Sequence, residues 1–138
     1  RQISMNRFED KVHKARRDQG ELKTEEVTDI WLRTQRQMFG DSVTLSQNYG
    51  IWWSYIPHFL HTPGYVYSYA FGELLVLALY ARYKNEGGAF VPKYLDLLSA
   101  GATQTPYMLL EPFDVNLDDP GFWNDGLKII DEMLAMLE

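Results

Sequence analysis

Hydrophobic residues recur at intervals of three and four along most of the chain, which is the spacing of one face of an amphipathic helix. This pattern predicts a first helix from near the start to about Asp18 and a second helix from Thr24 to Gly40. Glu25 and Glu26 follow Thr24 directly, and acidic residues are favoured in the first turn of a helix. Thr24 is therefore the expected N-cap of the second helix.

The helical pattern weakens between residues 41 and 64, where aromatic residues and prolines are frequent. Pro57 and Pro63 exclude one uninterrupted helix, because proline lacks a backbone N–H and clashes with the preceding turn. We expect a short helix followed by a shaped loop. A long helix rich in Leu and Ala is then predicted from about Tyr65 to Lys84, and it is expected to be the central, most buried element.

Turn and cap residues divide the rest of the chain into further helices. Pro92 begins one helix and Gly101 follows its end, because proline suits the first turn and glycine the C-terminal stop. Thr105 caps a single turn through Leu110, and Asp119 precedes a closing amphipathic helix. No segment alternates Val, Ile or Thr with polar residues, so the predicted fold is all-α.

Length and composition narrow the class of protein. The 138 residues suit one domain, and we expect residues 1–138 to form a single all-helical segment. With 13 Lys and Arg against 19 Asp and Glu, the net charge of −6 disfavours nucleic acid and anionic membranes as partners. The absence of cysteine excludes disulfides and thiol nucleophiles and suits a cytoplasmic protein. The most apolar run is too short to span a bilayer and contains charged residues.

The beginning of the chain already has a helical pattern. Residues 1–17 alternate charges where a signal peptide would need an apolar region. They also lack a starting Met and a capping residue. We therefore expect the chain to have been cut from a longer protein.

Histidines and tyrosines gather around the Pro63-Gly64 break, where a loop should lead into the long helix. If that helix begins near Tyr65, then Tyr65 and Tyr69 stand four residues apart on one face, whereas Tyr67 points the other way. The preceding loop is able to bring a histidine, His58 or His61, back over the first helical turn. Several hydrogen-bond donors aimed at one point are what a developing oxyanion requires.

Simpler interpretations of the same residues remain open. An aromatic stripe at helical spacing is more often part of a core than of a site. His58 and His61 would supply two metal ligands, but a zinc site needs a third, which is not nearby. Glu73 lies in an apolar stretch, where we expect a neighbouring helix to satisfy its carboxylate.

Several motifs taken together resemble the oligoendopeptidase F family, which comprises thimet-oligopeptidase-like zinc metallopeptidases. The resemblance covers nearly the whole chain and is carried by residues 20–26, 39–41, 94–101 and 112–123, and above all by the stretch from Pro57-His58-Phe59 to Tyr69-Ala70-Phe71-Gly72. It implies that the chain is a helical C-terminal part of a zinc metallopeptidase catalytic domain. Gly64 departs from the family pattern, because many relatives have an aromatic residue there.

The resemblance also implies roles for the residues around the Pro63-Gly64 break. Family members hold zinc with a His-Glu-x-x-His helix and a further Glu, and none of these ligands is present in this chain. The whole parent protein is therefore expected to bind zinc, whereas this fragment is expected to bind none and to be inactive alone. The positions that match the family's catalytic His and Tyr residues are His58, Tyr65 and Tyr69, and His61 and Tyr67 are expected to bind substrate.

The predicted function is the substrate-binding and oxyanion-stabilising part of a metalloendopeptidase that hydrolyses oligopeptides in the cytoplasm. The alternative is a non-catalytic helical module in which the aromatic segment of residues 51–65 binds a peptide or a partner helix. If the chain was cut from a larger domain, we expect the surface exposed by truncation to cause either homodimerisation or a tendency to aggregate.

Overall fold

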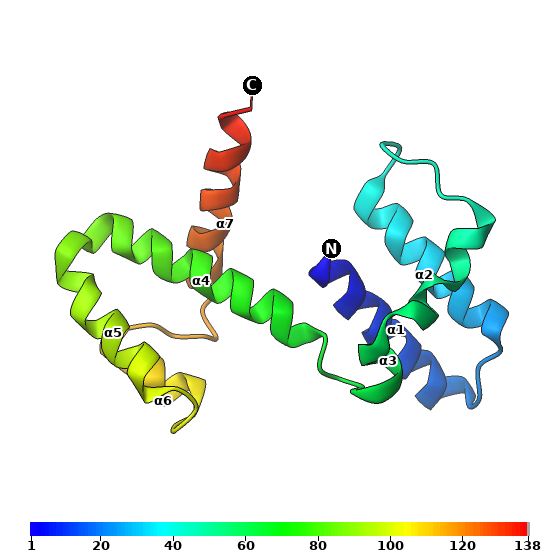
Figure 1. The fold of residues 1–138 in the computed structure, drawn as a ribbon, viewed down its shortest axis with the longest axis horizontal. Helices are drawn as coiled ribbons and strands as arrows, with labels where there is room; N and C mark the ends of the chain where they lie inside the picture. The colour runs from blue at the N-terminus through cyan, green and yellow to red at the C-terminus, as the bar shows by residue number, and fades with distance from the viewer. Residues whose placement is uncertain (138) are drawn as a thin grey trace. The chain divides into compact units, whose positions relative to one another are not determined.

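The computed structural model describes residues 1–137, and every regular element in that range is helical, which confirms the predicted all-α class (Figure 1). The chain divides into two compact units, residues 1–71 and 72–138, and each unit has its own hydrophobic core. Because two such units can belong to one larger domain, the single segment expected over residues 1–138 stays a prediction.

The first unit contains two long helices, two short helical segments and the first residues of a further helix. These are α1 (Gln2–Gln19), α2 (Thr24–Phe39), the 3₁₀ segment η1 (Gln47–Tyr55), α3 (Pro57–His61) and the start of α4 (Tyr67–Glu86). In its core, Phe8 of α1 packs edge-on against Trp31 of α2, with the ring centroids 5.1 Å apart. Trp31 also donates its indole N–H to the carbonyl of Tyr49 at 3.1 Å, which joins η1 to α2.

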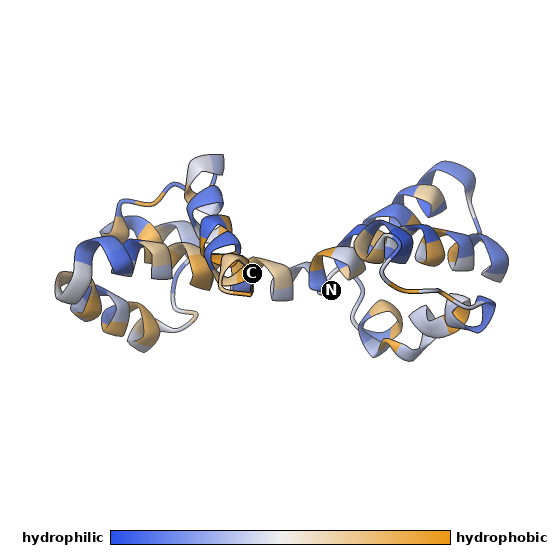
Figure 2. Cartoon of the chain, turned by 90° about the horizontal axis from the view of Figure 1, so that it is seen from above, coloured by the Kyte–Doolittle hydropathy of each residue, from blue (hydrophilic) through white to orange (hydrophobic). Residues whose placement is uncertain are grey.

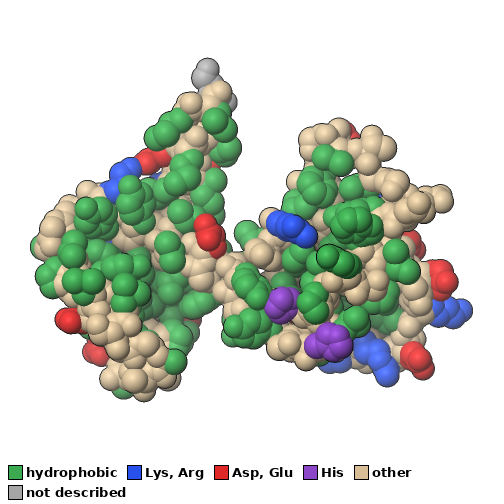
Figure 3. All heavy atoms as spheres, viewed as in Figure 1, with side chains coloured by type: hydrophobic (Ala, Val, Ile, Leu, Met, Phe, Trp, Pro, Cys, Tyr) green, Lys and Arg blue, Asp and Glu red, His purple; other side chains and the backbone are tan. Residues whose placement is uncertain are grey.

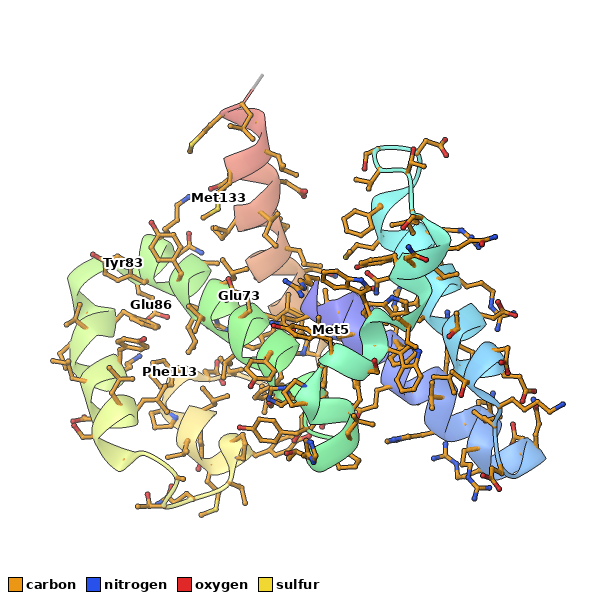
Figure 4. All side chains as sticks on the ribbon, turned by 45° about the vertical axis from the view of Figure 1, so that its right-hand side comes forward. Met5, Glu73, Tyr83, Glu86, Phe113 and Met133 are labelled. Carbon is orange, nitrogen blue, oxygen red and sulfur yellow. The ribbon has the colours of Figure 1, made fainter. Side chains whose placement is uncertain are left out.

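The second unit contains the rest of α4 and the elements that follow it. These are η2 (Gly87–Ala89), α5 (Phe90–Ala100), α6 (Pro106–Leu110), η3 (Glu111–Phe113) and α7 (Pro120–Ala135). Its core includes Ala78, Leu110 and Phe113, all nearly inaccessible to solvent, and Figure 4 shows Phe113 lying between α4, α5 and α6. Figure 2 shows hydrophobic and hydrophilic residues alternating along the helices of both units, as expected of amphipathic helices.

Helix α7 crosses α4 at a very short distance. A Cβ atom added at Gly126 would lie 2.7 Å from the backbone nitrogen of Ala78 and 3.2 Å from the carbonyl oxygen of Leu74. Only glycine fits this contact without displacing backbone, which explains why glycine occurs inside an otherwise good helix.

Most of the predicted helix ends agree with the structure. Thr105 accepts a hydrogen bond from the backbone of Met108, and Asp119 accepts one from Gly121, so both capping predictions are confirmed. The predicted N-cap of α2 is wrong by one residue: Lys23 occupies that position, and its N–H donates to the Glu26 carboxylate at 2.8 Å. The acidic first turn therefore stabilises the helix start in place of a threonine side chain.

The long helix differs from its prediction in its start and in its burial. It begins at Tyr67 instead of Tyr65, because a turn with an N–H···O bond from Tyr65 to Thr62 occupies the preceding residues. Its buried residues are Ala78, Leu79 and Ala81, whereas the shorter helices α1 and α2 have four buried residues each. The expectation that it is the most buried element is therefore wrong. Glu73, expected to meet a neighbouring helix, is exposed on α4 (Figure 4).

Among the described helices, none combines the length and the hydropathy that crossing a membrane requires.

Candidate functional site

Helix α3 presents His58 from the surface of the first unit. Pro57 occupies its first position, where a missing N–H costs nothing and the fixed φ angle suits a helix start. Phe59, the residue after His58, anchors this short helix, since its ring packs against Phe8 and Trp31 at centroid distances of 4.9 and 6.4 Å. A helix of five residues has little stability of its own, so these aromatic contacts fix where His58 lies.

Tyr65 lies just before α4, and Tyr69 lies in its first turn. The backbone N–H and the hydroxyl of Ser68 both donate to the carbonyl of Tyr65, at 3.0 and 2.7 Å, so Tyr65 lies in the turn that begins the helix. The two tyrosine rings consequently meet edge to face, with centroids 5.9 Å apart and planes at 88°. The expected neighbourhood of Tyr65 and Tyr69 is therefore present, although the regular helix begins two residues later than predicted.

His58 contacts both tyrosines. Its Nε2 atom lies 2.9 Å from the hydroxyl oxygen of Tyr69, within hydrogen-bonding distance. Its ring is parallel to that of Tyr65, with planes at 11° and centroids 6.2 Å apart, and perpendicular to that of Tyr69. The three residues predicted to be catalytic therefore form one group, which we call the His58–Tyr65–Tyr69 cluster.

The cluster is accessible to a ligand. The Tyr65 side chain is 50% exposed and that of Tyr69 is 42% exposed, and His58 is half-buried. Neither tyrosine belongs to the two core clusters of the described residues. Figure 3 shows histidine side chains at the surface of the first unit, beside hydrophobic ones, as such an accessible cluster requires.

The hydrogen bond between His58 and Tyr69 has two chemical forms, which depend on the tautomer of the imidazole. If Nε2 carries a proton, it donates to the Tyr69 oxygen, and the Tyr69 O–H stays free to donate to a ligand. If Nε2 is unprotonated, it accepts a hydrogen bond from the Tyr69 O–H, and this O–H is then not free to donate to a ligand. The protonation of one ring atom thus decides whether Tyr69 offers a hydrogen bond outward.

Among the described residues, His61 and Tyr67 make none of the ring contacts or hydrogen bonds that join the cluster. His61 is the exposed last residue of α3. Tyr67 is the first residue of α4, and its side chain is 55% exposed. Of the two histidines left open by the sequence, His58 is the one that meets Tyr65 and Tyr69. Substrate binding by His61 and Tyr67 stays a prediction.

Glu9 on α1 is a contributor that the sequence did not reveal. Its side chain is only 6% exposed, and its Oε1 atom accepts a hydrogen bond from the backbone N–H of Gly64 at 2.7 Å. This contact joins positions 55 residues apart and secures the loop that leads into Tyr65. The one available signal was an acidic residue next to Phe8 on the apolar face of the first helix.

The described residues do not fit a zinc site. Within residues 1–137, no three His, Asp or Glu side chains gather closely enough to coordinate an ion. Nε2 of His58 lies within hydrogen-bonding distance of the Tyr69 hydroxyl, a contact in which His61 has no part. The contact between His58 and Tyr69 shows that the cluster is built for hydrogen bonding.

A second candidate pocket lies in the other unit. It has a volume of about 300 Å³ and is almost entirely apolar, and it is lined by residues of α4 and α5 that include Tyr80, Tyr83 and Tyr94. It contains no residue of the His58–Tyr65–Tyr69 cluster, and the ionisable side chains among its described lining residues are the phenols of these three tyrosines. No described histidine or carboxylate lines the pocket beside them, whereas His58 accompanies the phenols of the cluster.

Comparison with known proteins decides the family. The sequence matches Peptidase family M3 over residues 1–129, which includes every residue of the cluster and Glu9. The chain belongs to peptidase family M3. The family resemblance inferred from the sequence motifs is thereby confirmed.

Curated relatives within the family have names that agree with this assignment. Oligopeptidase PepF of Bacillus subtilis (strain 168) is 31% identical over 138 residues, which is 100% of this chain and 20% of that protein. Oligoendopeptidase F, chromosomal, of Lactococcus lactis subsp. cremoris is 26% identical over 138 residues, 100% of this chain and 23% of that protein. The chain thus spans about a fifth of the length of the curated relatives it matches. No solved structure matches it.

Proposed function

We propose that this chain is the substrate-side part of a zinc-dependent metalloendopeptidase that hydrolyses short peptides in the cytoplasm. Membership of peptidase family M3 supports a peptidase as the whole protein. The relatives' names, oligopeptidase and oligoendopeptidase, support short peptides as substrates. The single observation that carries the proposal for these residues is the exposed group formed by His58, Tyr65 and Tyr69.

The proposed role of the cluster is to stabilise the oxyanion that forms when a peptide carbonyl is attacked. Negative charge develops on the carbonyl oxygen at that stage, and donors held in place beforehand stabilise it without the cost of reorganisation. Tyr69 donates its O–H to this oxygen, and Tyr65 provides the second phenol at the other edge of the cluster. His58 holds the Tyr69 ring through the 2.9 Å contact between Nε2 and the hydroxyl.

This role requires one form of the His58–Tyr69 hydrogen bond. Nε2–H must donate to the Tyr69 oxygen, so that the Tyr69 proton remains available for the substrate. A donor that itself accepts a hydrogen bond is polarised and becomes a stronger donor. His58 therefore acts through Tyr69 and need not touch the substrate to affect the rate.

A non-catalytic peptide-binding module is the second candidate, and one observation favours it. Trp52 and Tyr55 of η1 are 52% and 78% exposed, and their ring centroids are 6.1 Å apart. Exposed aromatic pairs provide much contact area at low entropic cost, as binding surfaces require. Under this alternative the His58–Tyr65–Tyr69 cluster has no chemical role.

Complementation tests the two candidates. The chain is mixed, in the presence of zinc, with the separately produced remainder of the Bacillus subtilis relative, the part outside the matched region, and cleavage of a fluorogenic peptide is followed. The metalloendopeptidase proposal predicts activity that needs both segments and that falls when Tyr65 or Tyr69 is replaced by Phe. Activity that is unchanged in both variants would exclude the oxyanion role. Peptide binding with no cleavage in the mixture, and with full dependence on Trp52, would favour the binding module.

A further inference from the structure

We propose that Glu9 is a positioning residue for the His58–Tyr65–Tyr69 cluster, a role that rests on the function proposed above. Its carboxylate holds the loop of residues 62–65 in the conformation that delivers Tyr65 to His58. The hydrogen bond of Glu9 is made to the backbone N–H of Gly64, so Glu9 acts on the cluster through this backbone.

Glu9 is a buried carboxylate on α1. A carboxylate that is only 6% exposed loses most of its hydration, and such a loss is tolerated only where hydrogen bonds compensate for it. The compensating bond is the short one from Gly64 N–H, at 2.7 Å. Charge-assisted bonds of this length are stronger than bonds between neutral groups, so this contact restrains the loop firmly.

Gly64 has a left-handed backbone conformation. Its φ angle is +79°, in the left-handed region that glycine adopts without strain. The next residue, Tyr65, donates its N–H to the carbonyl of Thr62 at 3.3 Å and completes the turn. The bond to Glu9 therefore fixes the residue immediately before Tyr65, in a turn that is otherwise exposed to solvent.

Phe8, the residue before Glu9, positions the helix that carries His58. Phe8 packs against Phe59 at a centroid distance of 4.9 Å and so fixes α3, which carries His58. Glu9 fixes the loop that carries Tyr65. Two consecutive residues of one helical turn of α1 thus hold the two sides of the cluster, and the rigid turn sets the separation between them.

The test begins with three variants of the 138-residue chain. Glu9→Met keeps the length of the side chain and suits a buried site, but it cannot accept the Gly64 hydrogen bond. Glu9→Gln keeps an acceptor oxygen and is the conservative rescue. Asp10→Ala removes an exposed carboxylate from the neighbouring position of α1 and is the matched control.

The measured quantities are the exchange rate of the Gly64 amide proton and the NMR contacts between the His58 and Tyr65 rings. In Glu9→Met we expect exchange to accelerate about tenfold or more, as the loss of a charge-assisted bond requires, and the ring contacts to weaken. Asp10→Ala should resemble the wild type, and Glu9→Gln, which keeps a neutral acceptor, should lie between the wild type and Glu9→Met. Contacts between Phe8 and Trp31 should persist in all variants and report that the fold is intact. Unchanged Gly64 exchange in Glu9→Met would overturn the proposal, as would a Glu9→Gln variant that behaves like Glu9→Met.

Kinetics of the complemented peptidase complete the test. A positioning residue predicts that Glu9→Met lowers kcat about tenfold or more with little change in KM, and that Glu9→Gln restores most of it. Altered Gly64 exchange with unchanged kcat would overturn the positioning role. If the wild-type mixture has no peptidase activity, the proposed function fails, and the exchange measurement still decides whether Glu9 holds the loop.

Discussion

The hydroxyl of Tyr69 lies 2.9 Å from Nε2 of His58, and this contact joins the first turn of α4 to the short helix α3. Tyr69→Phe removes the hydroxyl and keeps the ring that packs against Tyr65 and His58. In the complemented peptidase we expect kcat to fall about 100- to 1000-fold, the usual cost of losing one oxyanion donor. The measurement is steady-state cleavage of a fluorogenic peptide.

The matched control for Tyr69→Phe is Tyr83→Phe, which removes the hydroxyl of an equally exposed tyrosine of α4 that lies outside the cluster. Both variants should unfold at nearly the same temperature as the wild type, because each keeps its ring and loses only the hydroxyl of an exposed side chain. An equal loss of turnover in both variants would show that the cluster has no special role.

Gly126 is expected to be intolerant of any side chain. Alanine is normally the better residue in a helix by about 0.5–1 kcal/mol, but here its Cβ would lie 2.7 Å from the backbone of Ala78. Overpacking typically costs about 1–3 kcal/mol, which outweighs the gain in helix propensity. Gly126→Ala should therefore lower the free energy of unfolding, as measured by thermal or urea denaturation.

Gly88→Ala is the control for this prediction, because a Cβ at Gly88 would meet no atom within 4 Å. It should leave the free energy of unfolding within about 0.5 kcal/mol of the wild type. A Gly126→Ala variant as stable as Gly88→Ala would contradict the close crossing of α4 and α7.

Phe8 is the expected anchor of the first unit. Its ring is 2% exposed and packs against Trp31 and Phe59. Phe8→Ala should cost about 3–5 kcal/mol of unfolding free energy, because it removes a buried ring and leaves a cavity. Ile3→Ala on the same helix is the control, since Ile3 is 48% exposed and should lose far less. Urea denaturation followed by circular dichroism measures both, and similar losses would contradict the proposed core.

Tyr107 is predicted to ionise at unusually high pH. Its O–H donates to Asp118 Oδ1 at 3.1 Å, and this bond and the negative charge of Asp118 raise the pKa of Tyr107 above its ordinary value of 10.0. A group whose pKa is raised by folding stabilises the fold below its unfolded pKa, and that contribution disappears as the pH rises through the folded pKa. The contribution of Tyr107 is therefore present at neutral pH and lost above pH 10.0.

The test for Tyr107 is an NMR titration of its ring. Asp118→Asn removes the charged acceptor and should bring the pKa of Tyr107 down toward its ordinary value. Asp96→Asn removes an exposed acid elsewhere in the same unit and should leave the pKa of Tyr107 unchanged. An unchanged Tyr107 titration in Asp118→Asn would show that the hydrogen bond does not form in solution.

Local interactions made much of the fold predictable. The capping residues Thr105 and Asp119 and the glycine stop at Gly101 act on residues within a few positions of themselves, so the sequence alone places them. The contact of Tyr65 with Tyr69 is also local, but it arises from the turn that precedes α4, because the helix begins only at Tyr67. The family motif, too, depends only on the order of residues.

Contacts between distant segments depended on the packing of helices, which no local rule describes. The sequence left His58 and His61 as alternatives, and the position of α3 on Phe8 and Trp31 brought His58 to the tyrosines. The bond from Gly64 to Glu9 spans 55 positions. Such a partnership arises only when hydrophobic burial brings α1 and the loop together, because burial is non-directional and does not specify which polar groups will meet. The sequence by itself determined the helices and the family, and the tertiary structure decided which residues form the site.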